Sequence, residues 1–401
     1  MKRIVAFQLL LLVINNSTTA QPLKFRLEAG AADRTGLPIF VTLQKPLAQS
    51  QYEVVNLKNK KRAAAQYLDS SHILFISPDS LPVGTTVEYL LQKKLETLKS
   101  PPVSIIQKPE GLLVSVKNQP LLFYHTQPAL PPADSPANYQ RSGFIHPLYS
   151  PTGKVLTDDF PAGHAHQHGI FMAWVHTKFK DSLVDFWNTM EQLGRVEHVS
   201  VLEKKTGAIA SGLKLDLRHK SLQFGEVLRE NWTVTIYPTT SYFLFDIESD
   251  QVNTTQDTLY LEEYRYGGMA FRGSREWNQS DSPHFKGDWI ITTSEGKDRI
   301  SANHTHARWV DASGKVQGEM NGLTVFDHPA NFRYPQTIRV HPDMPYWVYA
   351  PVVEGPFNIP PGAHYRSRFR YLVHRNGVDM KLIDKIEKDW INPPKIEWIK
   401  N

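Results

Sequence analysis

The feature that most constrains the fold is a two-residue alternation of apolar and polar side chains that recurs along much of the chain. Val227–Tyr237 and Tyr365–Val373 are long segments of this type, and such a period places alternate side chains on opposite faces of a β-strand. Long alternating segments favour antiparallel sheets. The one segment with clear helical periodicity is Val378–Trp390, where apolar residues recur at spacings of three and four. The sequence therefore predicts an all-β fold with one C-terminal helix.

Two domains are predicted from the distribution of these segments. Residues 21–107 contain about five short β-like segments and no helical period, which is typical of a small β-sandwich. A polar hinge, Gln107–Gly111, precedes a new apolar segment. Residues 111–401 form the second domain. This length of antiparallel structure exceeds a simple immunoglobulin sandwich, so we expect a larger two-sheet fold.

The first twenty residues have the pattern of an export signal. Lys2 and Arg3 precede an apolar run, Ile4–Ile14, and the segment ends in small and polar residues up to Ala20. An apolar run of about 11 residues is too short to cross a hydrocarbon core, which needs roughly 20. We therefore expect residues 1–20 to be removed as a signal peptide, leaving a protein without a membrane span in the bacterial periplasm or the secreted fraction.

Composition excludes several kinds of chemistry. The chain has no Cys, which removes disulfides, thiol nucleophiles and cysteine-bound metals and suits a periplasmic location. The net charge of +5 is spread without a dense basic run, so no nucleic-acid partner is expected. Phosphate-binding loops, dinucleotide fingerprints and the Gly-x-Ser-x-Gly elbow are missing from the sequence.

Histidines are concentrated in one part of the second domain. Six of the 16 lie within 53 residues: His146, His164, His166, His168, His176 and His198. In an extended segment the imidazoles of His164, His166 and His168 would point the same way. Such a group could transfer protons, bind a transition metal or donate hydrogen bonds to a polyol. The alternative is that these histidines are turn and surface residues.

A metal site is a weaker interpretation of the same histidines. Three imidazoles suit Zn or Cu, with His146 or His328 as the additional ligand. However, alternate residues of a strand lie about 6.5 to 7 Å apart, so the segment would have to curl before the three rings could share one ion. We therefore predict no cofactor and keep Zn or Cu as an alternative.

Three further segments carry candidate binding residues. In Leu261–Gly268, Glu263 and Arg265 would share one strand face and Tyr264 and Tyr266 the other, and the paired glycines allow close approach of a ligand or strand. The loop Phe326–Tyr334 offers polar side chains, and Asp185–Asn188 offers an aromatic platform for a sugar ring. The alternative for Glu263 and Arg265 is a structural ion pair. The alternative for the loop is a capped turn, and the alternative for the aromatic platform is a side chain of the core. The loop and platform candidates are His328, Asn331, Arg333, Asp185 and Trp187.

The order of these motifs resembles a known bacterial family. Phe144–Pro151, Leu156–Pro161, His164–Phe171, Val184–Trp187, Tyr266–Gly268, Ala307–Asp311 and Phe326–Pro329 are similar to segments of the "methane oxygenase PmoA-like" family. The resemblance covers about Gly111–Arg375. It implies a galactose mutarotase-like supersandwich, a fold that sugar epimerases, polysaccharide lyases and some glycosidases use.

The leading functional hypothesis is an exported carbohydrate-active enzyme that hydrolyses, eliminates or epimerises a sugar or oligosaccharide by acid–base chemistry. His166 and His168 are the predicted proton-transfer pair, with Glu263 as counter-base. The predicted substrate-binding residues are His146, His164, Asp185, Trp187, Arg265, Tyr266, His328, Asn331 and Arg333. The alternatives are a noncatalytic glycan-binding protein and a metal-dependent oxidoreductase or hydrolase.

Overall fold

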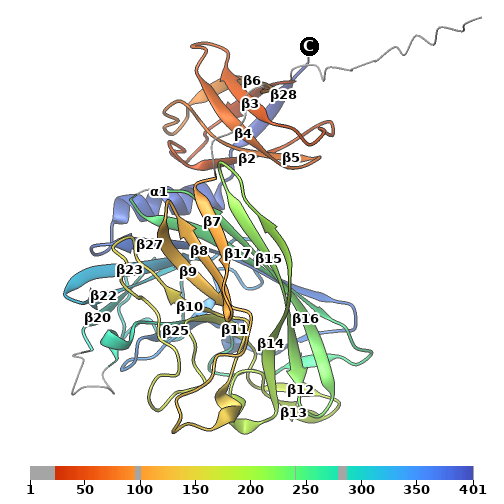
Figure 1. Cartoon of the computed structure of the whole chain (residues 1–401), viewed down its shortest axis with the longest axis vertical. Helices are drawn as coiled ribbons and strands as arrows, with labels where there is room; N and C mark the ends of the chain where they lie inside the picture. The colour runs from red at the N-terminus through yellow and green to blue at the C-terminus, as the bar shows by residue number, and fades with distance from the viewer. Residues whose placement is uncertain (1–22, 95–100, 240, 279–286, 401) are drawn as a thin grey trace, which may run out of the picture.

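Two β-rich units make up the chain in the computed structural model, which describes residues 23–94, 101–239, 241–278 and 287–400. A small unit formed mainly by N-terminal strands lies at one end of the molecule, and a much larger unit carries the rest (Figure 1). The predicted signal peptide lies outside the described residues.

The small unit is a single antiparallel sheet of seven strands. It has its own apolar core around Phe25, Phe75 and Tyr89. In spatial order the strands are β2 (Pro38–Thr42), β5 (His72–Ile76), β4 (Arg62–Asp69), β3 (Tyr52–Asn56), β6 (Thr86–Lys93), β1 (Leu23–Glu28) and β28 (Lys395–Ile399). The last strand comes from the other end of the sequence, so the small unit is not continuous in the chain.

The large unit is built on a sheet of nine strands and a sheet of eight. The nine-stranded order is β21 (Thr305–His306), β24 (Thr337–Val340), β25 (Tyr346–Tyr349), β19 (Gly268–Arg272), β11 (Ile170–Ala173), β10 (Ile145–Leu148), β9 (Gln119–His125), β8 (Gly111–Val116) and β7 (Val103–Gln107). The eight-stranded order is β14 (Gly194–Lys205), β15 (Ser211–Ser221), β16 (Gly225–Tyr237), β17 (Phe243–Asn253), β27 (His364–Arg375), β23 (Glu319–Phe326), β22 (Trp309–Val316) and β20 (Trp289–Thr293).

A smaller sheet and short helical turns complete the unit. The four-stranded sheet is β13 (Ser182–Val184), β12 (Thr177–Phe179), β18 (Leu259–Leu261) and β26 (Phe357–Ile359). The 3-10 turns are η1 (Ala137–Tyr139), η2 (Thr189–Glu191), η3 (Arg275–Trp277) and η5 (Pro351–Glu354). One continuous apolar core is shared by strands of all three sheets. The predicted all-β sandwich architecture is confirmed.

The alternation in the long strands has a physical consequence on their polar face. β17 and β27 pair so that Asp246 faces Arg370 and Asp250 faces Arg366. The Asp250–Arg366 pair is exposed, as expected for a solvated strand face. Arg370 is instead buried and donates to both oxygens of Asp246, because helix α1 covers this end of the sheet.

Helix α1 (Met380–Ile391) is the one α-helix in the described ranges and joins the two units. The carboxylate of Asp379 accepts hydrogen bonds from the first helical N–H groups, which is the role of an N-cap. Its apolar residues Ile383 and Ile386 pack with Leu37 and Leu74 of the small unit and with β-strand residues of the large unit. The helix therefore lies between the two units, as Figure 1 shows.

The boundary between the small unit and the large unit lies before the predicted hinge in the sequence. β7 pairs along its whole length with β8, so Gln107–Gly111 is the turn of a hairpin within the large unit. The change of sheet falls between β6 and β7. Among the described residues, no helix is long and apolar enough to cross a membrane.

Candidate functional site

A cavity of about 340 Å³ opens over the β11, β19, β24 and β25 end of the nine-stranded sheet. Four separate connections contribute its walls, and we call it the histidine–arginine cavity. Its lining residues are His164, His166, Gln167, Asn188, Met190, Glu191, Tyr264, Arg265, Tyr266, Arg339, His341, Met344 and Tyr346. Its volume lies within the range of small-molecule sites.

The His164–His168 segment is two consecutive turns, not a strand. The N–H of His164 donates to the carbonyl of Pro161, and the N–H of Gln167 donates to the carbonyl of His164. The prediction that three imidazoles align on one face was therefore wrong. The turns direct His164 and His166 to the cavity, with ring centroids 5.8 Å apart, whereas His168 enters the core.

His166 is the more enclosed of the two cavity histidines. Its side chain is 8% exposed, and its Nδ1 is buried without a hydrogen-bond partner. Burial, assisted by the positive field of neighbouring groups, lowers the pKa of His166 to about 3. The ring is therefore neutral at pH 7 and has a nitrogen that can accept a proton or a hydrogen bond.

The turn between β24 and β25 contributes a second pair of groups. The Nδ1 of His341 accepts from the backbone N–H groups of Asp343 and Met344, which places the proton of the neutral ring on Nε2. Burial lowers the pKa of His341 to about 4. Arg339 is anchored through Nη1, which donates to Asn303 Oδ1 at 2.7 Å and to the carbonyl of Val340 at 2.6 Å.

The segment before β19 brings Tyr264, Arg265 and Tyr266 to the same cavity. The guanidinium carbon of Arg265 lies 5.6 Å from the ring centroid of each tyrosine. The segment is irregular here, so the predicted alternation of Arg265 and the tyrosines on opposite faces was wrong. Gly268 has a φ of +137°, and a Cβ on it would lie 2.2 Å from the carbonyl oxygen of Tyr349. Close approach of a strand therefore explains this glycine.

A buried aromatic layer supports the tyrosines. Trp187 is fully buried, with ring centroids 5.2 Å from Tyr266 and 6.0 Å from Tyr346. It stiffens the cavity from behind instead of offering an exposed stacking surface. Asp185 accepts from the backbone N–H groups of Trp187 and Asn188. Asn188 in turn accepts from the hydroxyl of Tyr266 at 3.2 Å.

His168 is fully buried and His146 is half-buried, and both lie near Asp159. His168 Nδ1 is 2.5 Å from Asp159 Oδ1, and burial lowers the pKa of His168 well below its usual range. His146 Nδ1 is 2.9 Å from Thr157 Oγ1. Neither histidine lines the histidine–arginine cavity. The structure therefore separates His168 from His166, its predicted partner in proton transfer.

The remaining predicted site residues lie outside the cavity. Glu263 is exposed and is not part of the lining, where the carboxylate is Glu191. His328 lines a different cavity next to α1. Asn331 bonds to Asp327 and to the backbone of Arg368, and Arg333 binds the carbonyls of Pro351, Gly355 and Pro356. Both of these side chains hold loops together.

The sequence analysis missed Arg339, His341 and Tyr346. Their signal is weak, because each stands alone in a short strand or turn. The segment from His341 to Pro345 has a histidine in a proline-flanked polar turn, as the His164 segment does, and this likeness could have singled it out. Within the described ranges no three His, Asp or Glu side chains are grouped to hold a metal ion, so the metal alternative gains no support.

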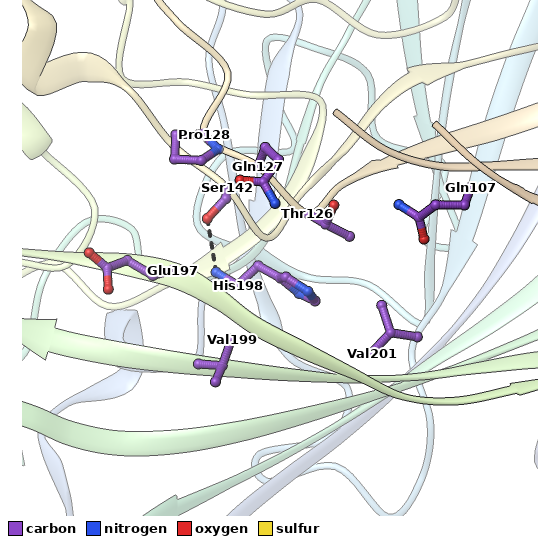
Figure 2. A pocket seen from close by; sticks show the side chains of 9 residues that line it. All are labelled: Gln107, Thr126, Gln127, Pro128, Ser142, Glu197, His198, Val199 and Val201. Atoms are coloured by element: carbon purple, nitrogen blue, oxygen red, sulfur yellow. Dashed lines mark hydrogen bonds between the residues drawn. The ribbon is translucent and has the colours of Figure 1, made fainter. Parts of the chain in front are cut away.

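A larger groove of about 500 Å³ lies along β14, and Figure 2 shows its lining. Several of its polar groups already have partners within the protein. The backbone N–H of His198 donates to Ser142 Oγ at 2.9 Å, its Nδ1 is 3.0 Å from the hydroxyl of Tyr124, and Glu197 pairs with Arg195 and Arg218. This groove offers few free groups to a ligand, so the histidine–arginine cavity is the stronger candidate.

Several solved structures resemble the chain at low identity. An α-mannosidase from Enterococcus faecalis V583 is 10% identical with a TM-score of 0.47, over 94% of this chain and 46% of the mannosidase. Heparan sulfate lyase HepC from Pedobacter heparinus is 10% identical with a TM-score of 0.35, over 72% and 38%. The α-galactosidase AgaA from Geobacillus stearothermophilus is 13% identical with a TM-score of 0.34, over 70% and 40%. The chain therefore spans less than half of each of these proteins.

The sequence comparisons give a family without a known activity. No curated protein matches the sequence. A family model matches residues 111–388, and its description is "Family of unknown function (DUF6807)". This match does not carry the PmoA-like name that the motifs suggested. It covers more than half of the chain and most of the large unit, so this protein belongs to the DUF6807 family.

Proposed function

We propose that the protein is an exported carbohydrate-active enzyme and that the histidine–arginine cavity is its active site. The observation that carries the proposal is the convergence of imidazole, phenol and guanidinium groups on one cavity of about 340 Å³. Sugars present many hydroxyl groups, which such donors and acceptors bind, and the tyrosine rings supply faces for the apolar side of a pyranose.

His166 is the proposed proton acceptor. A general base must be unprotonated at the working pH and must reach the proton that it removes. The ring of His166 is unprotonated at pH 7, and it lies in the cavity lining, where a ligand would contact it. Its low pKa makes it a weak base before a ligand binds, and a negative charge on a bound ligand would raise that pKa. Tyr266, whose pKa burial raises to about 12, keeps its phenolic proton at pH 7 and is the proposed donor to the departing oxygen in an elimination.

The number of carboxyl groups in the cavity lining favours some reactions over others. Glycoside hydrolysis most often needs two carboxyl groups, about 5 to 10 Å apart, on either side of the bond. Among the lining residues only Glu191 has a carboxyl group. The proposed reaction is therefore a proton abstraction that leads to epimerisation or elimination, with His166 in place of a carboxylate base.

The test is incubation of the enzyme with oligosaccharides in D₂O, followed by NMR. Proton abstraction predicts exchange of one carbon-bound hydrogen, with an unsaturated product in the case of elimination. His166→Gln should lower the rate at least about 100-fold, the usual contribution of a general base, while the melting temperature stays nearly unchanged.

His198→Gln is the matched control. His198 is also a partly buried histidine whose pKa burial lowers to about 4, but it lines the groove of Figure 2, so its variant should keep full activity. Saturable binding without any product would reject the catalytic claim and support a glycan-binding protein. Full activity in His166→Gln would reject the assigned base.

A further inference from the structure

The histidine–arginine cavity contains positive charge that the protein does not neutralise. Arg265 and Arg339 both line it, and neither has a carboxylate within ion-pair distance in the described parts of the chain. Glu191 is the one acidic side chain in the lining. The histidines add no charge of their own, because their lowered pKa values keep them neutral at pH 7.

A third guanidinium lies directly behind the cavity wall. Arg272 is fully buried, and its Nη1 donates to Gln167 Oε1 at 2.9 Å. Its Nε and Nη2 are buried without hydrogen-bond partners. Burial lowers the pKa of Arg272 to about 10, so the group is still charged at pH 7. The charge of the nearby Asp158 offsets part of the cost of burying this cation, and an anion in the cavity would stabilise it further.

The two lining arginines have unused donors. The guanidinium of Arg265 stacks beside Tyr264 and Tyr266 and makes no hydrogen bond with any described residue. Arg339 uses Nη1 to bind Asn303 and Val340, which leaves Nε and Nη2 available. Burial and the nearby charge of Arg265 lower the pKa of Arg339, so the two cations repel each other across the cavity.

From this charge pattern we infer that the cavity takes an anionic sugar, with a carboxylate or sulfate group held between Arg265 and Arg339. The inference rests on the proposed function, because it names the substrate class of the same site. A planar guanidinium binds either group through two parallel hydrogen bonds. The anion would also relieve the repulsion between the arginines and would add to the negative charge that Asp158 places near Arg272.

Matched pairs of sugars test the inference, with binding measured by calorimetry at constant ionic strength. The pairs are glucuronate and glucose, galacturonate and galactose, and N-acetylglucosamine with and without a 6-sulfate. In at least one pair the anionic member should bind about tenfold or more tightly, as expected for a charge-assisted pair of hydrogen bonds. The carboxylate and sulfate pairs show which anion the site prefers.

Substitutions then locate the preference. Arg265→Gln and Arg339→Gln should each remove most of it, because the anionic sugar should lose about tenfold or more in affinity and the neutral sugar much less. Arg366→Gln is the control, because Arg366 is an exposed arginine on β27 paired with Asp250 and lies outside the lining. It should leave the preference intact.

The outcomes separate this inference from the proposed function. If neutral sugars bind as tightly as their anionic partners, or if both cavity variants keep the preference, the inference is overturned and a sugar site remains. If no saccharide of either kind binds, the proposed function fails and the inference fails with it.

Discussion

At the level of single residues, the path of the backbone around His166 decides which groups meet a ligand. Gly163 has a φ of +75°, in the left-handed region where glycine is favoured, and it allows the first of the two turns. The second turn ends at Gln167, and His168 and Gly169 then lead into β11. These turns place His164 and His166 in the cavity and His168 in the core.

Gly169→Ala tests how tightly this path is fixed. A Cβ at Gly169 would lie 2.0 Å from the carbonyl oxygen of Ile145 and 3.1 Å from the Cβ of His146, so β10 and β11 would have to separate. We expect the free energy of unfolding to fall by more than about 2 kcal/mol, measured by urea unfolding.

Gly153→Ala is the matched control for that substitution. Gly153 has a φ of +79°, and nothing lies within 4 Å of a Cβ built there. Its replacement should cost only about 1 kcal/mol, the penalty for a left-handed alanine. Equal losses in the two variants would contradict a steric role for Gly169.

The chemical type of the site residues was easier to predict than the direction in which each side chain points. The sequence pointed to His164, His166, Arg265 and Tyr266, and all four line the cavity. The sequence does not show that two turns rotate His168 away, because a two-residue spacing means one face only if the segment is extended. Nor does the sequence show that the turn after β24 lies at the same cavity, since its position depends on pairing between strands that are distant in the sequence.

At the level of elements, long strands and the helix could be predicted because their periodicity is local. The predicted strand Val227–Tyr237 corresponds to β16, and the predicted helix Val378–Trp390 corresponds to α1, which begins after its Asp379 cap. β28 was not predicted. It is short, and its partner β1 lies at the opposite end of the sequence, so no local pattern identifies it.

Removal of β28 tests its contribution to the small unit. β28 pairs with β1 from Lys24 to Glu28, and the rings of Trp398 and Phe25 lie 5.3 Å apart. A chain ending at Pro394 loses this packing and leaves the edge of β1 unpaired. We expect the small unit to lose at least about 2 kcal/mol of stability and to be cleaved first in limited proteolysis followed by mass spectrometry.

Glu397→Gln provides the comparison for the truncated chain. It removes surface ion pairs with Lys395 and Arg26 but keeps the backbone pairing of β28. Because exposed ion pairs contribute little, its proteolysis pattern should match that of the unmodified protein. A truncated chain that resists protease equally well would show that β28 does not stabilise the sheet.

At the level of the whole molecule, a buried ionic network connects the two units through α1. Asp389 accepts from Arg34 of the small unit at 2.6 Å and from Arg370 of β27 at 3.3 Å, and Arg370 also binds Asp246. All of these groups are less than a tenth exposed. A buried pair is a weak source of stability but penalises other arrangements, since separation would leave charges unpaired. The network therefore fixes how the units dock.

The dependence of stability on pH is also a property of the whole molecule, because many buried groups contribute to it. Burial lowers the pKa of His166 to about 3 and that of four other histidines to about 4: His146, His198, His328 and His341. Burial raises the pKa of three acids: Asp158 and Asp159 to about 6, and Asp327 to about 7.

The two sets act in opposite directions, and the histidines prevail. As the pH falls through about 6.5, these histidines take up protons in the unfolded chain and not in the folded one, whereas the three acids take up protons in the folded chain. Since the histidines outnumber the acids, the unfolded state binds more protons. Each net proton changes the free energy of unfolding by about 1.4 kcal/mol per pH unit, so stability must decrease.

Between pH 6.5 and 5.5 we therefore expect the free energy of unfolding to fall by more than about 1.4 kcal/mol, measured by urea unfolding at fixed ionic strength. His166→Gln removes one histidine from the set. The slope of the free energy of unfolding against pH should therefore be shallower in this variant by about 1.4 kcal/mol per pH unit, the effect of one proton. Stability that stays constant or rises on acidification would mean that these imidazoles are not held neutral by burial, and the neutral base assigned to the cavity would lose its physical basis.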